Sequence, residues 1–167
     1  ALLDVRGLTI EYMTTRGGVR AVDDVSFTLQ RGETLALVGE SGSGKSTVAL
    51  GLLRLISPSS GRIAAGSVIY NGRDLAKLPE REMRLVRGAE IGTIFQDPAM
   101  ALNPVHTIGR QIAETMLLHN KATAQDAMDR AIELLRLVGV PAPADRIRQY
   151  PHNLSGGMRQ RVMIAMA

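Results

Sequence analysis

The sequence predicts an α/β fold that begins with an antiparallel β subdomain and continues as a helical subdomain from about Asp97. Three observations carry this prediction. Residues 1–30 are rich in Val, Ile, Thr and Leu, which favour strands. A glycine-rich loop then joins a short apolar run to a helical pattern, and the last third of the chain shows helical periodicity. The 167 residues suffice for one domain with a substantial core.

In the first half of the chain, strands are expected at 2–12 and 19–29, with residues 16–18 as the hairpin loop between them. The short apolar run at 34–38 predicts a buried strand of a parallel sheet. Apolar residues at helical spacing predict a helix at 45–56, which ends before a loop rich in Ser and Pro.

The second half moves from short mixed elements to helices. The expected elements are a strand at 66–70 closed by a turn at 71–72, a helix from Pro79 to about Val86, a short buried strand at 91–95, helices at 108–118 and 124–138, and a helical segment at 157–167.

Composition excludes several classes of protein. The net charge of +4 and the pI of about 10.0 arise from basic residues spread among acidic ones, so nucleic-acid binding is not expected. The chain has no cysteine, which rules out disulfides and thiolate metal sites within it. No apolar run approaches the roughly 18 residues that span a bilayer. Both ends are expected to be cut, because residue 1 already lies in a strand pattern and no helix stop signal precedes Ala167.

Residues 39–46 fit the pattern G-x-x-x-x-G-K-[ST] of a phosphate-binding P-loop, between an expected strand and an expected helix. Glycines let backbone N–H groups curve around an anion, and the helix adds the positive end of its dipole. Lys45 then places its charge on the β- and γ-phosphates of ATP, and the Ser46 hydroxyl can bind Mg²⁺. A Gly/Ser-rich loop with an incidental lysine is the alternative, which the strand–loop–helix context disfavours. The predicted ATP-binding residues of this segment are Gly39, Glu40, Ser41, Gly42, Ser43, Gly44, Lys45, Ser46 and Thr47.

A second candidate anion site is formed by Ser155, Gly156 and Gly157, directly before a helical pattern. The serine hydroxyl can cap the helix, and the glycines leave backbone donors unobstructed. Taken alone, the triplet is explained as well by a plain loop with a helix cap.

The P-loop, Gln96 after the strand expected at 91–95, and Leu154-Ser155-Gly156-Gly157 together resemble the nucleotide-binding domains of ABC transporters. The resemblance covers the whole chain in order and implies a P-loop NTPase fold with a RecA-like core. The domain boundaries it implies are an antiparallel β subdomain at 1–32 and 62–75, a P-loop core at 33–56 and 90–96, a helical subdomain with the signature motif at 97–156, and the start of the post-signature helix at 157–167.

The resemblance also implies roles for the signature residues. In the family, two domains sandwich two ATP molecules, so Ser155, Gly156 and Gly157 would face the γ-phosphate held by the P-loop of the other domain. Met158 is a departure, because the broad family usually has Gln at this position.

Two further residues carry roles over from the family. Gln96 resembles the Q-loop glutamine, which approaches Mg²⁺ and the attacking water, so Gln96 is the catalytic candidate and, with Ser46, a candidate Mg²⁺ ligand. Its alternative is a polar residue that ends a strand. Tyr12 resembles the aromatic residue that stacks on adenine, and its alternative is the packing of a half-buried strand residue.

The runs 95–98, 101–104 and 150–152 resemble the dipeptide/oligopeptide/nickel importers of bacteria. This resemblance implies an ATPase that drives uptake of peptides or related solutes at the cytoplasmic face of the inner membrane. Its partners would be a second ABC ATPase subunit, integral membrane permease subunits and, indirectly, an extracytoplasmic solute-binding protein. The alternatives are a non-transport ABC ATPase that acts on nucleic acid or ribosomes, and a nucleotide-binding module without turnover.

The family's Walker B strand, catalytic glutamate, D-loop and switch histidine would lie beyond Ala167. The three histidines of the chain precede the signature and lack metal-ligand spacing, so they are not substitutes; they are His106, His119 and His152. Hydrolysis is therefore expected of the full-length protein, and residues 1–167 are expected to be inactive by themselves.

Overall fold

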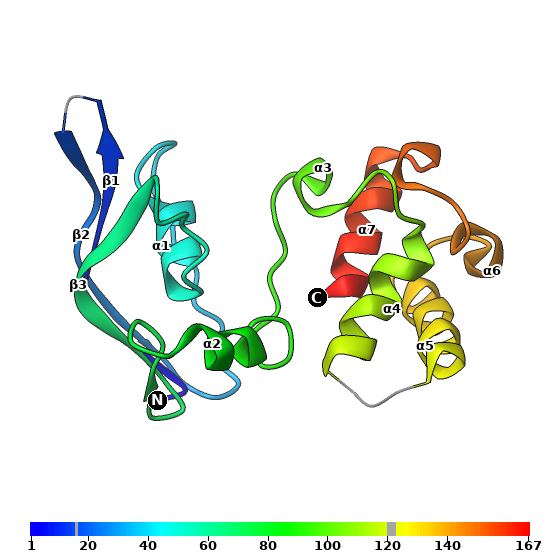
Figure 1. Cartoon of the computed structure of the whole chain (residues 1–167), viewed down its shortest axis with the longest axis horizontal. Helices are drawn as coiled ribbons and strands as arrows, with labels where there is room; N and C mark the ends of the chain where they lie inside the picture. Colours follow the sequence, from blue (N-terminus) through cyan, green and yellow to red (C-terminus); the bar gives the residue numbers. More distant parts are fainter. Residues whose placement is uncertain (16, 120–122) are drawn as a thin grey trace. The chain divides into compact units, whose positions relative to one another are not determined.

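The computed structural model describes residues 1–15, 17–119 and 123–167, which form two compact units. One unit comprises Ala1–Met83 and the other Arg84–Ala167 (Figure 1). The first contains a β-sheet and the glycine-rich loop, and the second is helical. Within the described residues, no helix is both long enough and apolar enough to cross a membrane.

The sheet of the first unit has four antiparallel strands in the order β2-β1-β3-β4 (Figure 1). Asn71 and Gly72 form the tight turn between the last two strands, with φ angles of 47° and 78°. Two successive positive φ angles define the type I′ turn that suits a two-residue hairpin, so the Asn-Gly pair accounts for this reversal. The strands are β1 Leu3–Thr14, β2 Gly17–Leu29, β3 Gly61–Tyr70 and β4 Arg73–Asp74.

Helix α1 (Lys45–Leu52) packs on β1 and β2 and begins directly at the glycine-rich loop. Its buried residues are Val48 and Gly51, and the missing side chain of Gly51 leaves room for the δ-methyl group of Ile10. The helix ends at Leu52 because the chain turns away two residues later, where Arg54 has a φ of 51°.

Arg54 ties the end of α1 to the following part of the first unit. Its guanidinium donates to the carbonyl oxygens of Leu75, at 3.5 Å, and Leu78, and it lies 3.7 Å from a carboxylate oxygen of Glu80. Glu80 begins helix α2 (Glu80–Val86), which follows Pro79 as the sequence predicts. The Arg54 side chain therefore supplies hydrogen-bond donors to carbonyl groups of this turn.

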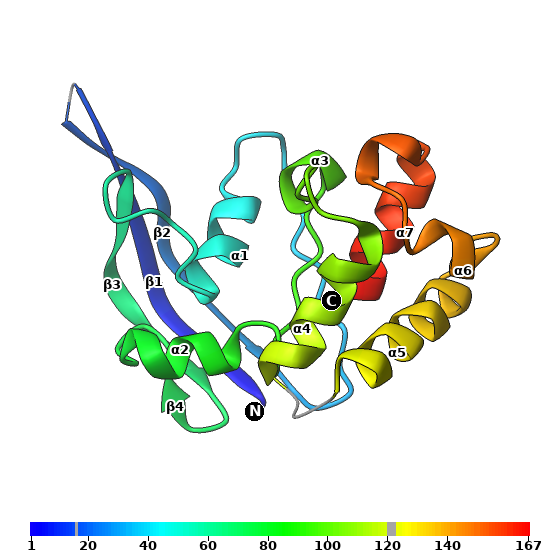
Figure 2. The ribbon, with the colours of Figure 1, turned by 45° about the vertical axis from the view of Figure 1, so that its right-hand side comes forward.

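The second unit is a helical bundle in which α4, α5 and α7 pack side by side (Figures 1 and 2). Its core is formed by apolar side chains, among them Ile108, Ile112, Leu135 and Val162, which are almost completely buried. The helices are α3 Pro98–Ala101, α4 Ile108–His119, α5 Ala124–Leu137, α6 Pro143–Arg146, the 3₁₀ helix η1 Pro151–Asn153, and α7 Gly156–Met166.

Local chemistry sets the helix ends in this unit. Thr123 and Asp126 form a capping box at the start of α5, in which each side chain serves the other's backbone N–H. At the other end, Arg161 of α7 donates to the carbonyl oxygens of Val138 and Gly139, at 3.0 and 2.7 Å. The orphan carbonyls that follow α5 thus receive a cationic donor from a neighbouring helix.

Most predicted elements are confirmed, including both long strands, the 71–72 turn, and α2, α4, α5 and α7. Two predicted strands are wrong. Residues 34–38 form no strand and are exposed, and of 91–95 only Ile91 makes an isolated bridge, to Arg87. An apolar run becomes a buried parallel strand only when strands lie beside it, and no described residue pairs with 34–38.

Smaller corrections concern boundaries. Gly17 and Gly18 belong to β2 rather than to the hairpin loop, and Arg16 lies outside the described residues. The predicted helix at 45–56 is four residues shorter at its end. The short elements β4, α3, α6 and η1 carry too little periodicity to be predicted.

Candidate nucleotide-binding site

The glycine-rich loop is held in shape by its own lysine. The Lys45 ammonium donates to the carbonyl oxygens of Gly39 at 2.8 Å and Glu40 at 2.5 Å, and lies 3.3 Å from the Ser43 hydroxyl. The Ser43 N–H also donates to the Glu40 carbonyl at 3.2 Å, which closes a turn in the loop. A cation is thus fixed inside the curve of the loop, at the position where an anionic ligand needs it.

The start of α1 offers the loop a set of backbone donors. Gly44 is the N-cap residue and provides no side-chain cap, and the first turn contains no acidic residue. The N–H groups of Lys45, Ser46 and Thr47 therefore have no acceptor within the helix and lie at its positive end. Ser46 is exposed beside them, with a hydroxyl that suits Mg²⁺. This set of donors fits the phosphates of a nucleotide with bound magnesium.

Gly44 is required at its position for two reasons. Its φ of 90° and ψ of 3° fall in the left-handed region, and a β-carbon there would lie 2.5 Å from the carbonyl oxygen of Ala21. The same β-carbon would lie 3.5 Å from a methyl group of Val22. Strand β2 therefore supports the loop directly, at a distance that only glycine allows.

Tyr12 lies on β1 in the same unit and is half-buried. It pairs with Val19 on β2 and with Gly61 on β3, and its ring lies over Gly61, where a β-carbon would be 2.8 Å from the ring. The packing alternative is therefore satisfied on one side of the ring. A role in binding adenine remains a prediction.

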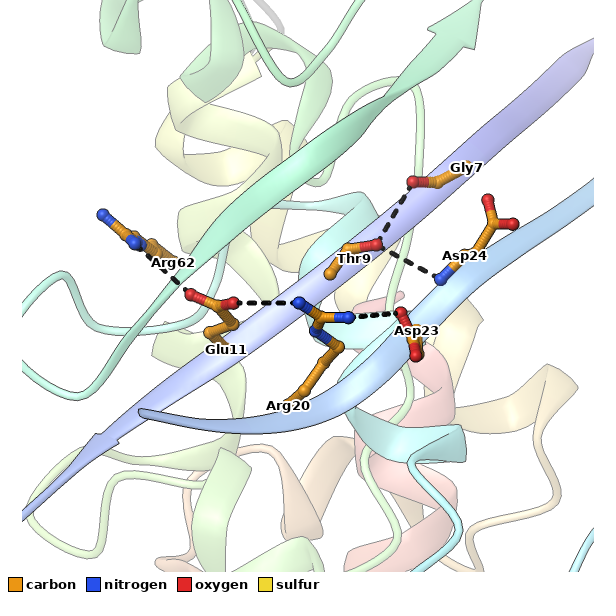
Figure 3. Close-up of polar contacts among 7 residues, drawn as sticks. All are labelled: Gly7, Thr9, Glu11, Arg20, Asp23, Asp24 and Arg62. Carbon is orange, nitrogen blue, oxygen red and sulfur yellow. Dashed lines mark hydrogen bonds and ion pairs between the residues drawn. The ribbon is translucent and has the colours of Figure 1, made fainter. Parts of the chain in front are cut away.

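The strand segment beside Tyr12 carries a chain of charged side chains that crosses three strands (Figure 3). Glu11 on β1 lies 3.3 Å from Arg62 on β3 and 3.8 Å from Arg20 on β2, and Arg20 lies 3.1 Å from Asp23. Both arginines are more than half exposed, so each pair contributes little free energy.

Gln96 and the signature belong to the second unit, whereas the P-loop and Tyr12 belong to the first. Gln96 is exposed in the non-helical stretch that precedes α3. It does not end a strand, because the strand predicted before it is absent. Its catalytic role stays a prediction from the resemblance.

The signature serine caps α7 as predicted. The Ser155 hydroxyl accepts from the N–H of Met158 at 3.3 Å. Gly156 and Gly157 are exposed, and a β-carbon on either would meet nothing within 4 Å. Leu154 is buried in the core and anchors the motif. The two glycines therefore present open backbone at the start of an 11-residue helix.

The packing of Met158 accounts for the departure from the family pattern at this position. It is half-buried and packs against the hydrophobic core of the second unit. An apolar side chain in this place adds buried area where glutamine would need polar partners. The backbone of the signature is unaffected by this exchange, since Ser155 still caps the helix.

Three polar side chains have structural roles that no sequence motif indicates, namely Thr9, Gln111 and Arg161. Each bonds to backbone groups that its own sequence neighbourhood does not specify. Thr9 and Gln111 are only 8% and 6% exposed. Their position among apolar residues in the sequence was the one indication that these polar side chains would be buried and hydrogen-bonded. No group of three or more potential metal-ligating side chains occurs within the described parts of the chain.

A glycine-rich loop that encloses a lysine at the start of a helix, next to a β-sheet, defines a nucleotide-binding domain of the P-loop class. The chain belongs to the ABC transporter family, whose sequence pattern matches residues 22–167. The fold class predicted from the sequence is thereby confirmed.

Curated relatives include peptide transport proteins. The chain is 51% identical to the oligopeptide transport ATP-binding protein OppD of Bacillus subtilis (strain 168), over 99% of the chain and 46% of that protein. It is 54% identical to a putative peptide import ATP-binding protein of Brucella abortus (strain 2308), over 99% of the chain and 50% of that protein. The chain thus spans about half the length of the curated relatives it matches.

Solved structures show the same architecture. A dimeric ATP-binding cassette, MJ0796, in a post-hydrolysis state bound to ADP and Pi superposes with a TM-score of 0.86 at 25% identity, over 98% of this chain and 68% of that chain. The ATP-binding subunit of an ABC transporter superposes with a TM-score of 0.73 at 29% identity, over 100% of this chain and 61% of that chain.

Proposed function

We propose that this chain is the nucleotide-binding part of an ABC importer ATPase that uses MgATP to drive the uptake of peptides or related small solutes. The observation that carries the proposal is the P-loop, in which Lys45 is held inside a curve of backbone at the uncapped start of α1. The peptide substrate is supported by the names of the relatives, which are oligopeptide, dipeptide and peptide import proteins.

The phosphates would be held by Lys45 and by the backbone of residues 39–47. Lys45 supplies charge to the β- and γ-phosphates, and the N–H groups of Ser46 and Thr47 supply hydrogen bonds at the positive end of the helix. Mg²⁺ would be held by the Ser46 hydroxyl and the Gln96 side-chain oxygen, both of them hard oxygen ligands. When bound, the metal offsets the negative charge that develops on the phosphates.

Turnover would take place in a dimer. The open backbone at Gly156 and Gly157, together with the Ser155 hydroxyl, would face the γ-phosphate bound by a second ABC subunit, with Met158 directly behind. A helix N-terminus without a blocking side chain suits this anion. The dimeric state of the cassette bound to ADP and Pi supports such an arrangement.

The remaining partners follow from the importer class. We assign the protein to the cytoplasmic face of the inner membrane, in contact with permease subunits, with a solute-binding protein acting from the other side. The contact with the permease would run through the stretch from Asp97 to about 120, which includes α3 and α4. Nucleic acid is not assigned as a partner.

Reconstitution tests this proposal. The full-length protein is incorporated with its permease subunits into vesicles, and ATP hydrolysis is measured with and without a peptide-loaded binding protein. Hydrolysis stimulated by the peptide, and lost in Lys45→Ala, is expected. Lys77→Ala is the matched control, because Lys77 is 80% exposed in the same unit and pairs with Asp74 at 3.3 Å, away from the P-loop in the sequence. A rate of ATP hydrolysis that does not change with the peptide or the permease, or that increases with RNA, would contradict the importer assignment.

A further inference from the structure

Strand β2 carries a β-bulge opposite Thr9. Leu8 pairs with Val25 and Ile10 pairs with Val22, so two residues of β2, Asp23 and Asp24, stand opposite the single residue Thr9. One extra residue on one strand is the definition of a bulge, and it sets the pairing of Ile10 with Val22. A further register shift follows between Ile10 and Glu11, which pairs with Arg20.

The Thr9 side chain holds this bulge in place (Figure 3). Its hydroxyl accepts from the N–H of Asp24 at 3.2 Å and lies 3.5 Å from the carbonyl oxygen of Gly7, to which it can donate. Thr9 is only 8% exposed. Asp24 needs this support because its φ is 50°, an uncommon conformation for a residue other than glycine. The hydroxyl therefore takes the place of the ladder partner that the bulged N–H lacks.

The register after the bulge determines what lies under the P-loop. Because of the extra residue, the side chain of Val22 is buried, whereas Asp23 and Asp24 are exposed. Val22 and the Ala21 carbonyl oxygen are the groups nearest to Gly44, and Ile10 lies against Gly51 of α1. A slip by one residue would turn Val22 away and place Asp23 or Ala21 toward the helix.

We propose that Thr9 is a positioning residue for the phosphate-binding loop: its hydroxyl fixes the bulge that sets the Ala21 carbonyl and Val22 against Gly44. The inference rests on the proposed nucleotide-binding function and assigns no contact between Thr9 and the nucleotide. The exposed ion pairs beside the bulge cannot replace this role, because water competes for them, whereas the Thr9 hydroxyl is buried.

Substitution with a side chain of the same shape distinguishes the effect of the Thr9 hydroxyl from the effect of side-chain packing. Thr9→Val keeps the β-branched shape and removes the acceptor, and Thr9→Ser restores the acceptor without the methyl group. The control is Thr28→Val, a threonine-to-valine change at an exposed position of β2. For each full-length variant, two quantities are measured: the dissociation constant for ATP, and the amide NMR signals of Gly44 and Ala21 in the protein without nucleotide.

Thr9→Val is expected to raise the dissociation constant about twofold to tenfold, the range of one net hydrogen bond, and to shift the Gly44 amide signal. Thr9→Ser and Thr28→Val are expected to stay close to the wild type in both quantities. Urea unfolding identifies the folded fraction, so that affinity is compared for folded protein only. A folded Thr9→Val protein with wild-type affinity and unchanged Gly44 signal would overturn the inference and leave the proposed function intact. A wild-type protein that binds no ATP would overturn both.

Discussion

The side-chain amide of Gln111 pairs with the backbone of Asn103 in both directions. The Asn103 N–H donates to Oε1 of Gln111 at 2.8 Å, and Nε2 of Gln111 donates back to the Asn103 carbonyl at 2.9 Å and to the His106 carbonyl at 2.9 Å. Gln111 is 6% exposed on α4, so one buried side chain satisfies three backbone groups of the loop before that helix.

Replacing this amide is expected to destabilise the protein strongly. Gln111→Leu keeps the volume and removes three hydrogen bonds to the backbone, although the Asn103 carbonyl still accepts from the His106 N–H at 3.3 Å. We expect this loss to lower the free energy of unfolding by about 2–4 kcal/mol. Gln125→Leu is the control, because Gln125 is exposed on α5 and its side chain bonds to the exposed side chain of Asp129. It should change stability by less than about 0.5 kcal/mol. Urea unfolding checks both, and equal stability of the two variants would contradict the structural role of Gln111.

Nucleotide affinity should depend more on the P-loop than on the aromatic residue. Lys45→Ala removes a cation that can make more than one charge-assisted hydrogen bond, each worth about 1.5–3 kcal/mol. Tyr12→Ala removes stacking worth about 1–3 kcal/mol and leaves the phosphates held. Titration of the full-length variants with a fluorescent ATP analogue is expected to show the larger loss for Lys45→Ala. A larger loss for Tyr12→Ala would place the main affinity at the adenine.

Two helix caps provide a test of the signature. Ser155 caps α7 and Thr123 caps α5, so Ser155→Ala and Thr123→Ala should each cost about 1 kcal/mol of stability. Only Ser155→Ala should also slow ATP hydrolysis in the dimer, because only Ser155 would face a nucleotide. Stability is followed by thermal unfolding and hydrolysis by phosphate release. Equal hydrolysis rates for the two variants would show that Ser155 acts only as a helix cap and has no role in hydrolysis.

The pH dependence of one surface pair has a defined sign. The Arg6 guanidinium donates to the Asp4 carboxylate at 2.9 and 2.5 Å, and this hydrogen bond lowers the pKa of Asp4 below its ordinary value of 3.8. A lowered folded-state pKa means that the pair stabilises the fold above pH 3.8, and that this contribution is lost as the pH falls through the folded-state pKa.

Carboxyl NMR titration measures this effect. Arg6→Gln should raise the pKa of Asp4 toward the ordinary value, because both the hydrogen bond and the charge are removed. Arg31→Gln is the control, since Arg31 bonds to the neutral side chain of Asn71 and should leave Asp4 unchanged. An Asp4 pKa that is the same in Arg6→Gln and the wild type would show that the pair does not persist in solution.

Local patterns predicted part of the fold. The periodicity of α4 and α5 and the Asn71-Gly72 turn are properties of neighbouring residues, and the structure confirms them. The run at 34–38 shows the limit, because its residues prefer strands but a strand also needs a partner. The early end of α1 depends on Arg54, whose bonds reach carbonyls 21 and 24 residues away.

The candidate site divides in the same way. The P-loop could be predicted because eight consecutive residues contain its chemistry, and their spacing alone specifies the turn and the lysine. The support that strand β2 gives to the P-loop could not be predicted. It brings the Ala21 carbonyl against Gly44 and depends on the bulge that Thr9 holds. Such contacts depend on how distant segments pack, which no local pattern records.

The exposed run at 34–38 has a practical consequence for solution measurements. Leu35, Leu37 and Val38 are 46%, 46% and 85% exposed, and no strand of the described chain pairs with them. Their amide protons should therefore exchange rapidly with deuterium, in contrast to those of the central strand β1. Because this run leads directly into the P-loop, its deuterium uptake is an intrinsic reporter, and slower uptake would reveal that another segment or subunit has paired with it.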